Sequence, residues 1–222
     1  MRVWRRPAAL VLAALSLTGG LGACAPVDPP PASEASRFKQ EYEILNGQRS
    51  LDGDSVYHTV TVPDGARVIY ADEASVRSLL DGGTGILYLG FPECPWCRTL
   101  LPSLFEAINR QQYKGAVYYN NTLEGRTNLR LEDGEIVTEK EGSALYELLL
   151  EKLGKHLGSY EGLGDPAIKR IYFPTTAFIK DGDVISVHLD TLPSQEDGSQ
   201  PLTDAQREEL TASLALEIQA IQ

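Results

Sequence analysis

Apolar and polar positions recur along this chain with periods that change from segment to segment, and these periods predict its secondary structure. Residues 86–89 form a continuous apolar run, which is typical of a strand covered on both faces of a sheet. Pro95 follows where a helix tolerates proline best, at the first position, because that amide would be unpaired anyway. Apolar side chains at helical spacing then predict a helix: Cys97, Leu101, Leu104, Phe105 and Ile108.

The segments before this strand predict two further strands and two helices. Ser36 is the expected cap of the first helix, which should end at Asn46-Gly47. Alternation of apolar and polar residues predicts the first strand, and a short apolar run predicts the second. The expected elements are a helix at 36–47, strands at 57–62 and 68–70, and a helix at 73–80.

The segments after the Pro95 helix predict a strand, two hairpins and two helices. Asp133-Gly134 and Asp181-Gly182 each stand between apolar runs, as turn residues of hairpins do. Thr203 and Gln206 have the spacing of a capping box. The expected elements are a parallel strand at 116–119, a hairpin within 129–137, a helix at 143–153, antiparallel strands at 174–180 and 184–189, and a final helix from 203. This order predicts an α/β fold.

Two cysteines at the start of the Pro95 helix have the spacing that thiol–disulfide chemistry requires. A Cys-x-x-Cys sequence lets the sulfurs of Cys94 and Cys97 close a small disulfide ring. The helix N-terminus favours the thiolate of Cys94, which is both the attacking species and a good leaving group. We expect Cys94 to be the exposed nucleophile and Cys97 to lie beneath it as the resolving thiol.

These residues resemble the thioredoxin superfamily. The resemblance rests on the strand, the turn Cys94-Pro95-Trp96-Cys97, a helix-kinking proline at Pro102, and a second motif at 172–184 that is similar to the family's cis-proline loop and hairpin. The segment 89–98 is similar to the corresponding segment in a narrower branch of this superfamily, the extracytoplasmic bacteriocin transport accessory proteins. The resemblance implies a three-layer α/β/α sandwich, here with an N-terminal strand and helix extension and a C-terminal helix.

The resemblance also assigns roles to residues around the cysteines. Pro95, Trp96 and Pro174 would shape the site, and the Phe173–Pro174 bond would be cis. Phe173 would then contact the substrate through its backbone. Cytoplasmic thioredoxins have a buried carboxylate six residues before the first cysteine, and Tyr88 stands at that position here. The resemblance therefore leaves the proton acceptor of Cys97 unassigned.

The first 35 residues have the pattern of an export signal and a tether. Three arginines precede a short apolar run that ends at Leu21-Gly22-Ala23-Cys24, which resembles a bacterial lipobox. Residues 1–23 are therefore expected to be a lipoprotein signal peptide and Cys24 the lipidated residue. An ordinary cleaved signal with a chance cysteine is the alternative. We expect residues 24–35 to be a proline-rich tether and residues 36–222 the thioredoxin-like domain.

Composition narrows the functional classes. The chain has 31 acidic and 20 basic side chains, a net charge of −11, which argues against nucleic acid and against electrostatic adhesion to anionic lipid. The chain has three cysteines, and the lipid anchor would use Cys24. Only the Cys94/Cys97 pair then remains, so we expect no structural framework of disulfides.

Metal binding is the chemical alternative for the two cysteines. Tetrahedral zinc would need two more ligands, and the candidates His58, His156 and His188 form no spaced pair. Copper could bind two thiolates, but such sites often use methionines, and the expected mature chain, residues 24–222, has none. We expect no metal and no cofactor.

The sequence thus predicts an extracytoplasmic thiol:disulfide oxidoreductase, held at the bacterial cell membrane by its lipid anchor alone. Its partners would be cysteine-containing exported proteins or peptides and a second redox protein that resets the pair. A non-catalytic thioredoxin-like accessory of a peptide export system is the alternative. The direction of the reaction is left open.

Overall fold

The computed structural model describes residues 33–51, 53 and 55–222 of the chain. These residues all belong to one compact unit, 32–222. The signal peptide, most of the tether and Cys24, all expected from the sequence, lie outside the described residues.

A mixed five-stranded sheet forms the centre of this unit, with the strand order β1-β3-β2-β6-β7. Strands β1, β3 and β2 run parallel, whereas β6 and β7 are antiparallel to their neighbours. The strands are β1 (Val68–Tyr70), β2 (Gly85–Leu89), β3 (Val117–Asn120), β6 (Thr175–Lys180) and β7 (Asp183–Leu189). All five residues of β2 are buried, which confirms the expected central strand.

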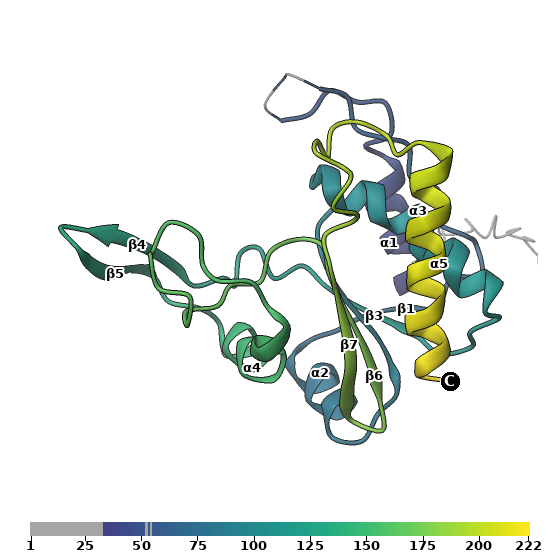
Figure 1. Ribbon diagram of the computed structural model, residues 1–222. Coiled ribbons are helices and arrows are strands. Elements are labelled where there is room, and N and C mark those ends of the chain that lie inside the picture. The colour runs from purple at the N-terminus through teal and green to yellow at the C-terminus, as the bar shows by residue number, and fades with distance from the viewer. Residues whose placement is uncertain (1–32, 52, 54) are drawn as a thin grey trace, which may run out of the picture. The chain divides into compact units, whose positions relative to one another are not determined.

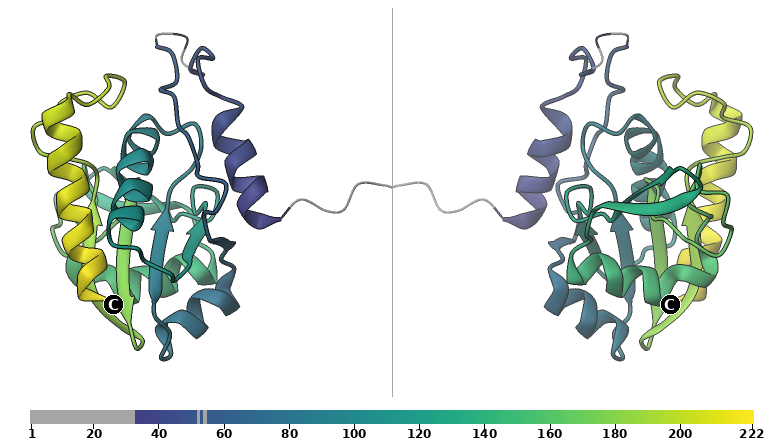
Figure 2. Two further views of the ribbon diagram at one scale, coloured as in Figure 1. Left: turned by 90° about the vertical axis from the view of Figure 1, so that its right-hand side faces the viewer. Right: turned by 90° about the vertical axis from the view of Figure 1, so that its left-hand side faces the viewer.

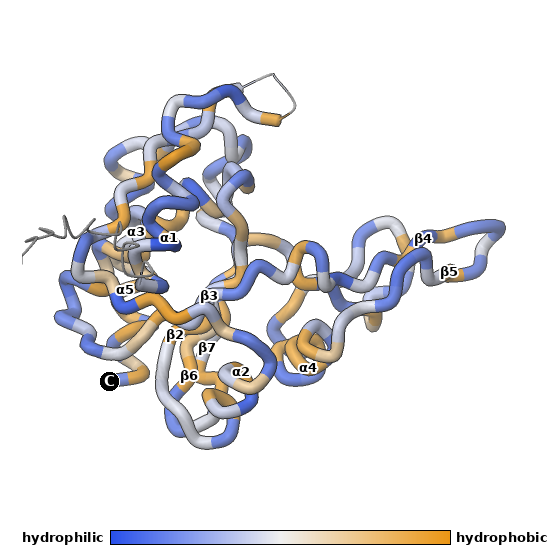
Figure 3. Tube along the Cα trace, turned by 180° about the vertical axis from the view of Figure 1, so that it is seen from behind, coloured by the Kyte–Doolittle hydropathy of each residue, from blue (hydrophilic) through white to orange (hydrophobic). Residues whose placement is uncertain are grey.

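Five α-helices pack around the sheet. Figures 1 and 2 show α1, α3 and α5 on one side of it and α2 and α4 on the other. The helices are α1 (Glu34–Glu43), α2 (Glu73–Leu80), α3 (Pro95–Arg110), α4 (Ala144–Leu153) and α5 (Asp204–Ala220). The last helix begins at the expected capping box of Thr203 and Gln206. Hydrophobic residues are concentrated along the central strands (Figure 3), so the core lies between the sheet and its helices.

The N-terminal part differs from the prediction in three places, the first being that α1 ends at Glu43, before the expected stop at Asn46-Gly47. Helix α1 begins at Glu34, because Ser33 rather than Ser36 caps it by accepting the backbone N–H of Ser36. Residues 57–62 form no named strand, although Val60 and Val62 are fully buried. The Asn46 side chain takes the place of a neighbouring strand. Its amide nitrogen donates to the carbonyl of Val60, and its oxygen accepts from the N–H of Val60. Local alternation predicted the burial but could not reveal this substitute partner.

The hairpin formed by β4 (Asn128–Glu132) and β5 (Glu135–Lys140) confirms the expected turn at Asp133-Gly134. It forms a separate two-stranded sheet and projects away from the five-stranded one (Figure 1). Its apolar side chains Leu131 and Ile136 are 48% and 41% exposed. The hairpin is therefore an arm on the molecule and contributes little to the core.

Candidate active site

Cys94 is the residue that precedes helix α3 and caps it. Its Sγ accepts a hydrogen bond from the backbone N–H of Cys97 at 3.2 Å. Pro95 occupies the first helical position, as expected. The sulfur therefore sits where the unpaired N–H groups of the helix meet, which is a favourable position for negative charge.

A second segment approaches this sulfur from the other side of the central strand. Strand β2 pairs with β6 in a register that sets Leu89 opposite Thr175, so Phe173 and Pro174 come beside the start of α3. The Phe173–Pro174 bond is cis, as expected. The Cys94 thiol donates to the carbonyl oxygen of Phe173 at 3.8 Å. The two sequence motifs, almost eighty residues apart, thus meet at one sulfur.

The two thiols have opposite electrostatic environments. The pKa of Cys94 lies below its usual value because of its hydrogen bond with the Cys97 thiol, with the backbone N–H groups of Cys97 and Trp96 adding to this against the effect of burial. Burial raises the pKa of Cys97 well above its usual value, and the neighbouring Cys94 raises it further. These directions match the expected roles of attacking and resolving thiol.

The expected exposure of Cys94 is wrong. Its exposed fraction is only 5%, whereas Cys97 is fully buried. The neighbouring Trp96 ring packs so closely on the backbone at Gly198 that a Cβ there would come within 2.6 Å of it. His58 bonds the carbonyl of Gly198 at 2.9 Å and holds this loop in place. The loop comes from the β7–α5 connection, which sequence alone could not bring to the site.

A groove of about 420 Å³ runs beside Trp96 and the cis-proline loop. It carries charge of both signs, from Glu161, Arg170 and Asp190. Asp190 donates its backbone N–H to the carbonyl of Pro174, and its carboxylate opposes the lowering of the Cys94 pKa. Burial also raises the pKa of Asp190 itself. The groove is the place where an extended chain could reach Cys94.

Tyr88 is a site residue to which sequence reasoning gave no role. A Cβ placed on Gly90 would lie 2.5 Å from the Tyr88 hydroxyl and 3.0 Å from the Cys97 sulfur, so both atoms crowd the same space. The Tyr88 hydroxyl opposes the raising of the Cys97 pKa and contacts the Tyr42 hydroxyl at 3.1 Å. The signal was present in the sequence as the departure from the family's carboxylate at this position.

Arg98 is the second residue that sequence reasoning missed. It follows Cys97 in α3 and is only 1% exposed. Its guanidinium donates to the carbonyls of Tyr42, His58 and Pro92 and to the side chain of Asn46. All of these acceptors are neutral. A charged residue directly after the second cysteine, on an otherwise apolar face, was the available signal.

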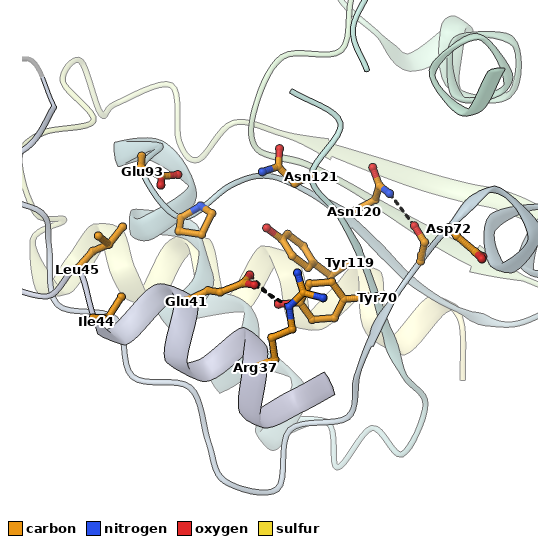
Figure 4. Close-up of a pocket in the computed structure, with 12 residues that line it drawn as sticks. Arg37, Glu41, Ile44, Leu45, Tyr70, Asp72, Glu93, Tyr119, Asn120 and Asn121 are labelled. Atoms are coloured by element: carbon orange, nitrogen blue, oxygen red, sulfur yellow. Dashed lines mark hydrogen bonds and ion pairs between the residues drawn. The ribbon is translucent and has the colours of Figure 1, made fainter. Parts of the chain in front are cut away.

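A second pocket, of about 630 Å³, is lined in part by the Pro92-Glu93 turn. Helix α1 contributes Glu41 to its wall, and the turn contributes Glu93 (Figure 4). Tyr119 of β3 lines it between Glu41 and Asn121. Burial raises the pKa of the Tyr119 phenol, and the Tyr42 hydroxyl opposes this as a hydrogen-bond partner.

The remaining candidates give no second centre. In the part of the chain that the structure describes, no three His, Cys, Asp or Glu residues are grouped as a metal site would require. His58 and His188 bond backbone carbonyls, at Gly198 and Thr191. Every helix among the described residues is too short or too polar to cross a bilayer.

No protein-family model, curated protein or solved structure matches this chain. What the site can do therefore follows from its own geometry and from the sequence motifs.

Proposed function

We propose that this chain is a thioredoxin-like thiol:disulfide oxidoreductase in which Cys94 attacks and Cys97 resolves. One observation carries the proposal: the Cys94 sulfur lies between the N–H groups of a helix start and the carbonyl of Phe173, with Cys97 buried behind it. The lowered pKa of Cys94 and the raised pKa of Cys97 support the division of roles. The five-stranded sheet between two helix layers is compatible with the fold that the motifs imply.

The reaction follows from the order of the two pKa values. The Cys94 thiolate attacks one sulfur of a substrate disulfide, whose other sulfur leaves as a thiolate and takes up a proton. Cys97 then loses its proton and attacks the Cys94 sulfur of the mixed disulfide, which frees the second substrate thiol. The pair ends as a disulfide and the substrate as two thiols. The same steps in reverse oxidise a substrate, so the resetting partner decides the direction.

The cellular setting is proposed from the sequence alone. Residues 1–23 would export the chain, and acyl groups on Cys24 would hold it at the outer face of the cell membrane. Substrates would then be cysteine-containing exported proteins or peptides. Replacing Cys24 with alanine should move the protein from the membrane fraction to the soluble fraction, and a Cys24→Ala protein that stays with the membrane would count against lipid anchoring.

Insulin reduction and reactivation of scrambled ribonuclease test the activity. The unsubstituted protein should catalyse at least one of these, and Cys94→Ser should abolish it because no thiolate is left at the helix start. Ser103→Ala is the matched control, since Ser103 is a buried residue on the same helix whose hydroxyl has no hydrogen-bond partner. Equal rates for Cys94→Ser and the unsubstituted protein would refute the proposal.

The second candidate is a binding module of a peptide export system whose cysteines cycle little. Two observations favour it: Cys94 is only 5% exposed, and the β4–β5 arm presents Leu131 and Ile136 to solvent. A binding module would leave both assays at the background rate and would retain its exporter partner after Cys94→Ser. Removal of Leu131 and Ile136 should then weaken that association.

A further inference from the structure

Cys97 has a proton that must leave before it can attack, and its surroundings make this departure difficult. The residue is fully buried, and burial keeps its thiol protonated at neutral pH. A buried thiolate without a donor would carry a large desolvation penalty. The resolving step that follows from the proposed function therefore requires a path for the proton and a hydrogen bond for the sulfur that remains.

The residue that faces this thiol is Tyr88. The small size of Gly90 allows the contact, because its missing Cβ leaves the space in which the Tyr88 hydroxyl and the Cys97 sulfur meet. Tyr88 is itself fully buried on the central strand β2. Its hydroxyl has a second neighbour, the hydroxyl of Tyr42, at 3.1 Å.

The chain of phenols continues from Tyr42 to Tyr119. The rings of these two residues meet edge-on with their centroids 6.3 Å apart, and the Tyr42 hydroxyl lowers the pKa of the Tyr119 phenol. Tyr119 also stacks on Tyr88, with centroids 5.8 Å apart. Tyr119 lines the pocket of Figure 4, together with the carboxylates of Glu41 and Glu93. A line of hydroxyls thus begins at the buried sulfur and ends at a pocket open to solvent.

We propose that Tyr88, Tyr42 and Tyr119 form a proton relay for Cys97, with Tyr88 as the catalytic residue that touches the reacting thiol. This inference rests on the proposed function, since it concerns the resolving step of that reaction. A buried carboxylate beside Cys97 would be the obvious proton acceptor. Tyr88 stands in its place here, and three neutral phenols carry the proton instead.

Each hydroxyl passes on one proton and receives another. The Cys97 proton moves to the Tyr88 oxygen while the Tyr88 proton moves to Tyr42, and the Tyr42 proton moves to Tyr119. The Tyr119 proton goes to water or a carboxylate in the pocket. The Cys97 electron pair then forms the new bond to the Cys94 sulfur, and the substrate sulfur leaves with the electrons of the bond that breaks. After the transfer each phenol donates toward the sulfur, so Tyr88 stabilises the thiolate that it has just produced.

Arg98 places the middle member of this chain. Its guanidinium donates to the backbone carbonyl of Tyr42 at 2.9 Å. Because Arg98 follows Cys97 directly in α3, the same turn of helix that carries the thiol also fixes the second phenol. We therefore regard Arg98 as a positioning residue.

A single equivalent of 5,5′-dithiobis(2-nitrobenzoate) separates the two steps of the reduced protein. Attack by Cys94 releases the first coloured thiolate and leaves a mixed disulfide on the enzyme. Attack by Cys97 releases the second and closes the Cys94–Cys97 disulfide. The first release tests the proposed function and the second tests the relay. If Cys94→Ser retains the first release at the normal rate, the proposed function fails, whatever the relay does.

Tyr88→Phe should leave the first release unchanged and slow the second at least about tenfold, because a positioned proton acceptor contributes roughly 10²–10⁴-fold. Tyr42→Phe should slow the second release as well, because it interrupts the chain. Tyr146→Phe, which removes a buried hydroxyl bonded by the N–H of Ile171, is the control and should change neither release.

Two results would overturn the relay. A normal second release in Tyr88→Phe would exclude Tyr88 from the step, and a normal second release in Tyr42→Phe would mean that Tyr88 acts alone. If Tyr88→Phe fails to fold, two other measurements test the relay: the second release in Tyr42→Phe and the solvent deuterium isotope effect in the unsubstituted protein. The relay requires a larger isotope effect on the second release than on the first, and equal effects would refute it.

Discussion

The two sulfurs of this site are three residues apart in sequence, yet they face regions built in different ways. Cys94 faces backbone: the N–H of Cys97, the carbonyl of Phe173 and the start of α3. Cys97 faces side chains, above all the hydroxyl of Tyr88 and the aromatic cluster behind it. The first region lowers the pKa of Cys94 through the Cys97 thiol and, beside it, through backbone N–H groups that every residue except proline has. The second uses particular residues from three separate elements.

The difference teaches which part of such a site tolerates substitution. Backbone donors remain when side chains change, so apart from the Cys97 thiol the activation of Cys94 depends on where the helix starts. The region behind Cys97 depends on close packing, since Phe38 contacts both Tyr88 and Tyr119 edge-on. Changes on the Cys97 side should therefore affect stability and the resolving step together, and changes on the Cys94 side should affect reactivity alone.

The largest expected effect comes from removing one sulfur at a time. Cys97→Ser should form a mixed disulfide with substrate through Cys94 and then stop, because no thiol remains to resolve it. Non-reducing electrophoresis and mass spectrometry would show the stable adduct. Cys94→Ser should form none under the same conditions. Adducts through Cys97 in the Cys94→Ser protein would show that the two regions do not divide the roles.

Gly90→Ala should be the most destabilising of the small changes, because the added Cβ would meet the Tyr88 hydroxyl and the Cys97 sulfur. Overpacking of this kind costs about 1–3 kcal/mol. Urea unfolding of the reduced protein measures it. Gly65→Ala is the matched control, since a Cβ there has open space around it. Equal unfolding midpoints for the two variants would show that the Cys97 side is not closely packed.

Alkylation rates against pH compare the two thiols directly. The lowered pKa of Cys94 means that its thiolate persists to lower pH, so its rate should fall only below that pKa, by about tenfold per pH unit. Cys97, with its raised pKa, should react more slowly at every pH up to neutrality. Iodoacetamide labelling of the reduced, unsubstituted protein, with the two cysteines distinguished by peptide mass spectrometry, gives the two profiles separately. Faster labelling of Cys97 would reverse the assignment of roles.

Trp96 should give the smallest signal, a change of fluorescence between the dithiol and disulfide forms. Its ring lies between the two cysteines in sequence and packs on the backbone at Gly198. A disulfide quenches indole emission at contact, so oxidation should lower the intensity. Trp96→Phe should remove the change and leave only the signal of Trp4, where that residue is present. An unchanged emission in oxidised protein, verified by thiol counting, would place the ring away from the sulfurs.

The same division explains what the sequence could predict. The Cys94 side is local: Pro95 marks the helix start, and the Tyr172-Phe173-Pro174 motif marks the loop that meets it. The Cys97 side is assembled from α1, β2 and β3, and no local pattern says that Tyr42 and Tyr119 come within reach of Tyr88. The contact between Trp96 and the loop at Gly198 was missed for the same reason, since that loop is remote in sequence.

Arg98 has a further consequence, for the way in which the molecule opens. Four of its five hydrogen bonds go to residues of the N-terminal extension, at Tyr42, Asn46 and His58. Detaching that extension would break them together and uncover the aromatic cluster that α1 shares with the sheet. We therefore expect local opening of α1 to cost much more free energy than fraying of an ordinary terminal helix. We expect the extension and α3 to behave as one cooperative unit, whose amide hydrogens exchange with solvent only when the whole unit unfolds.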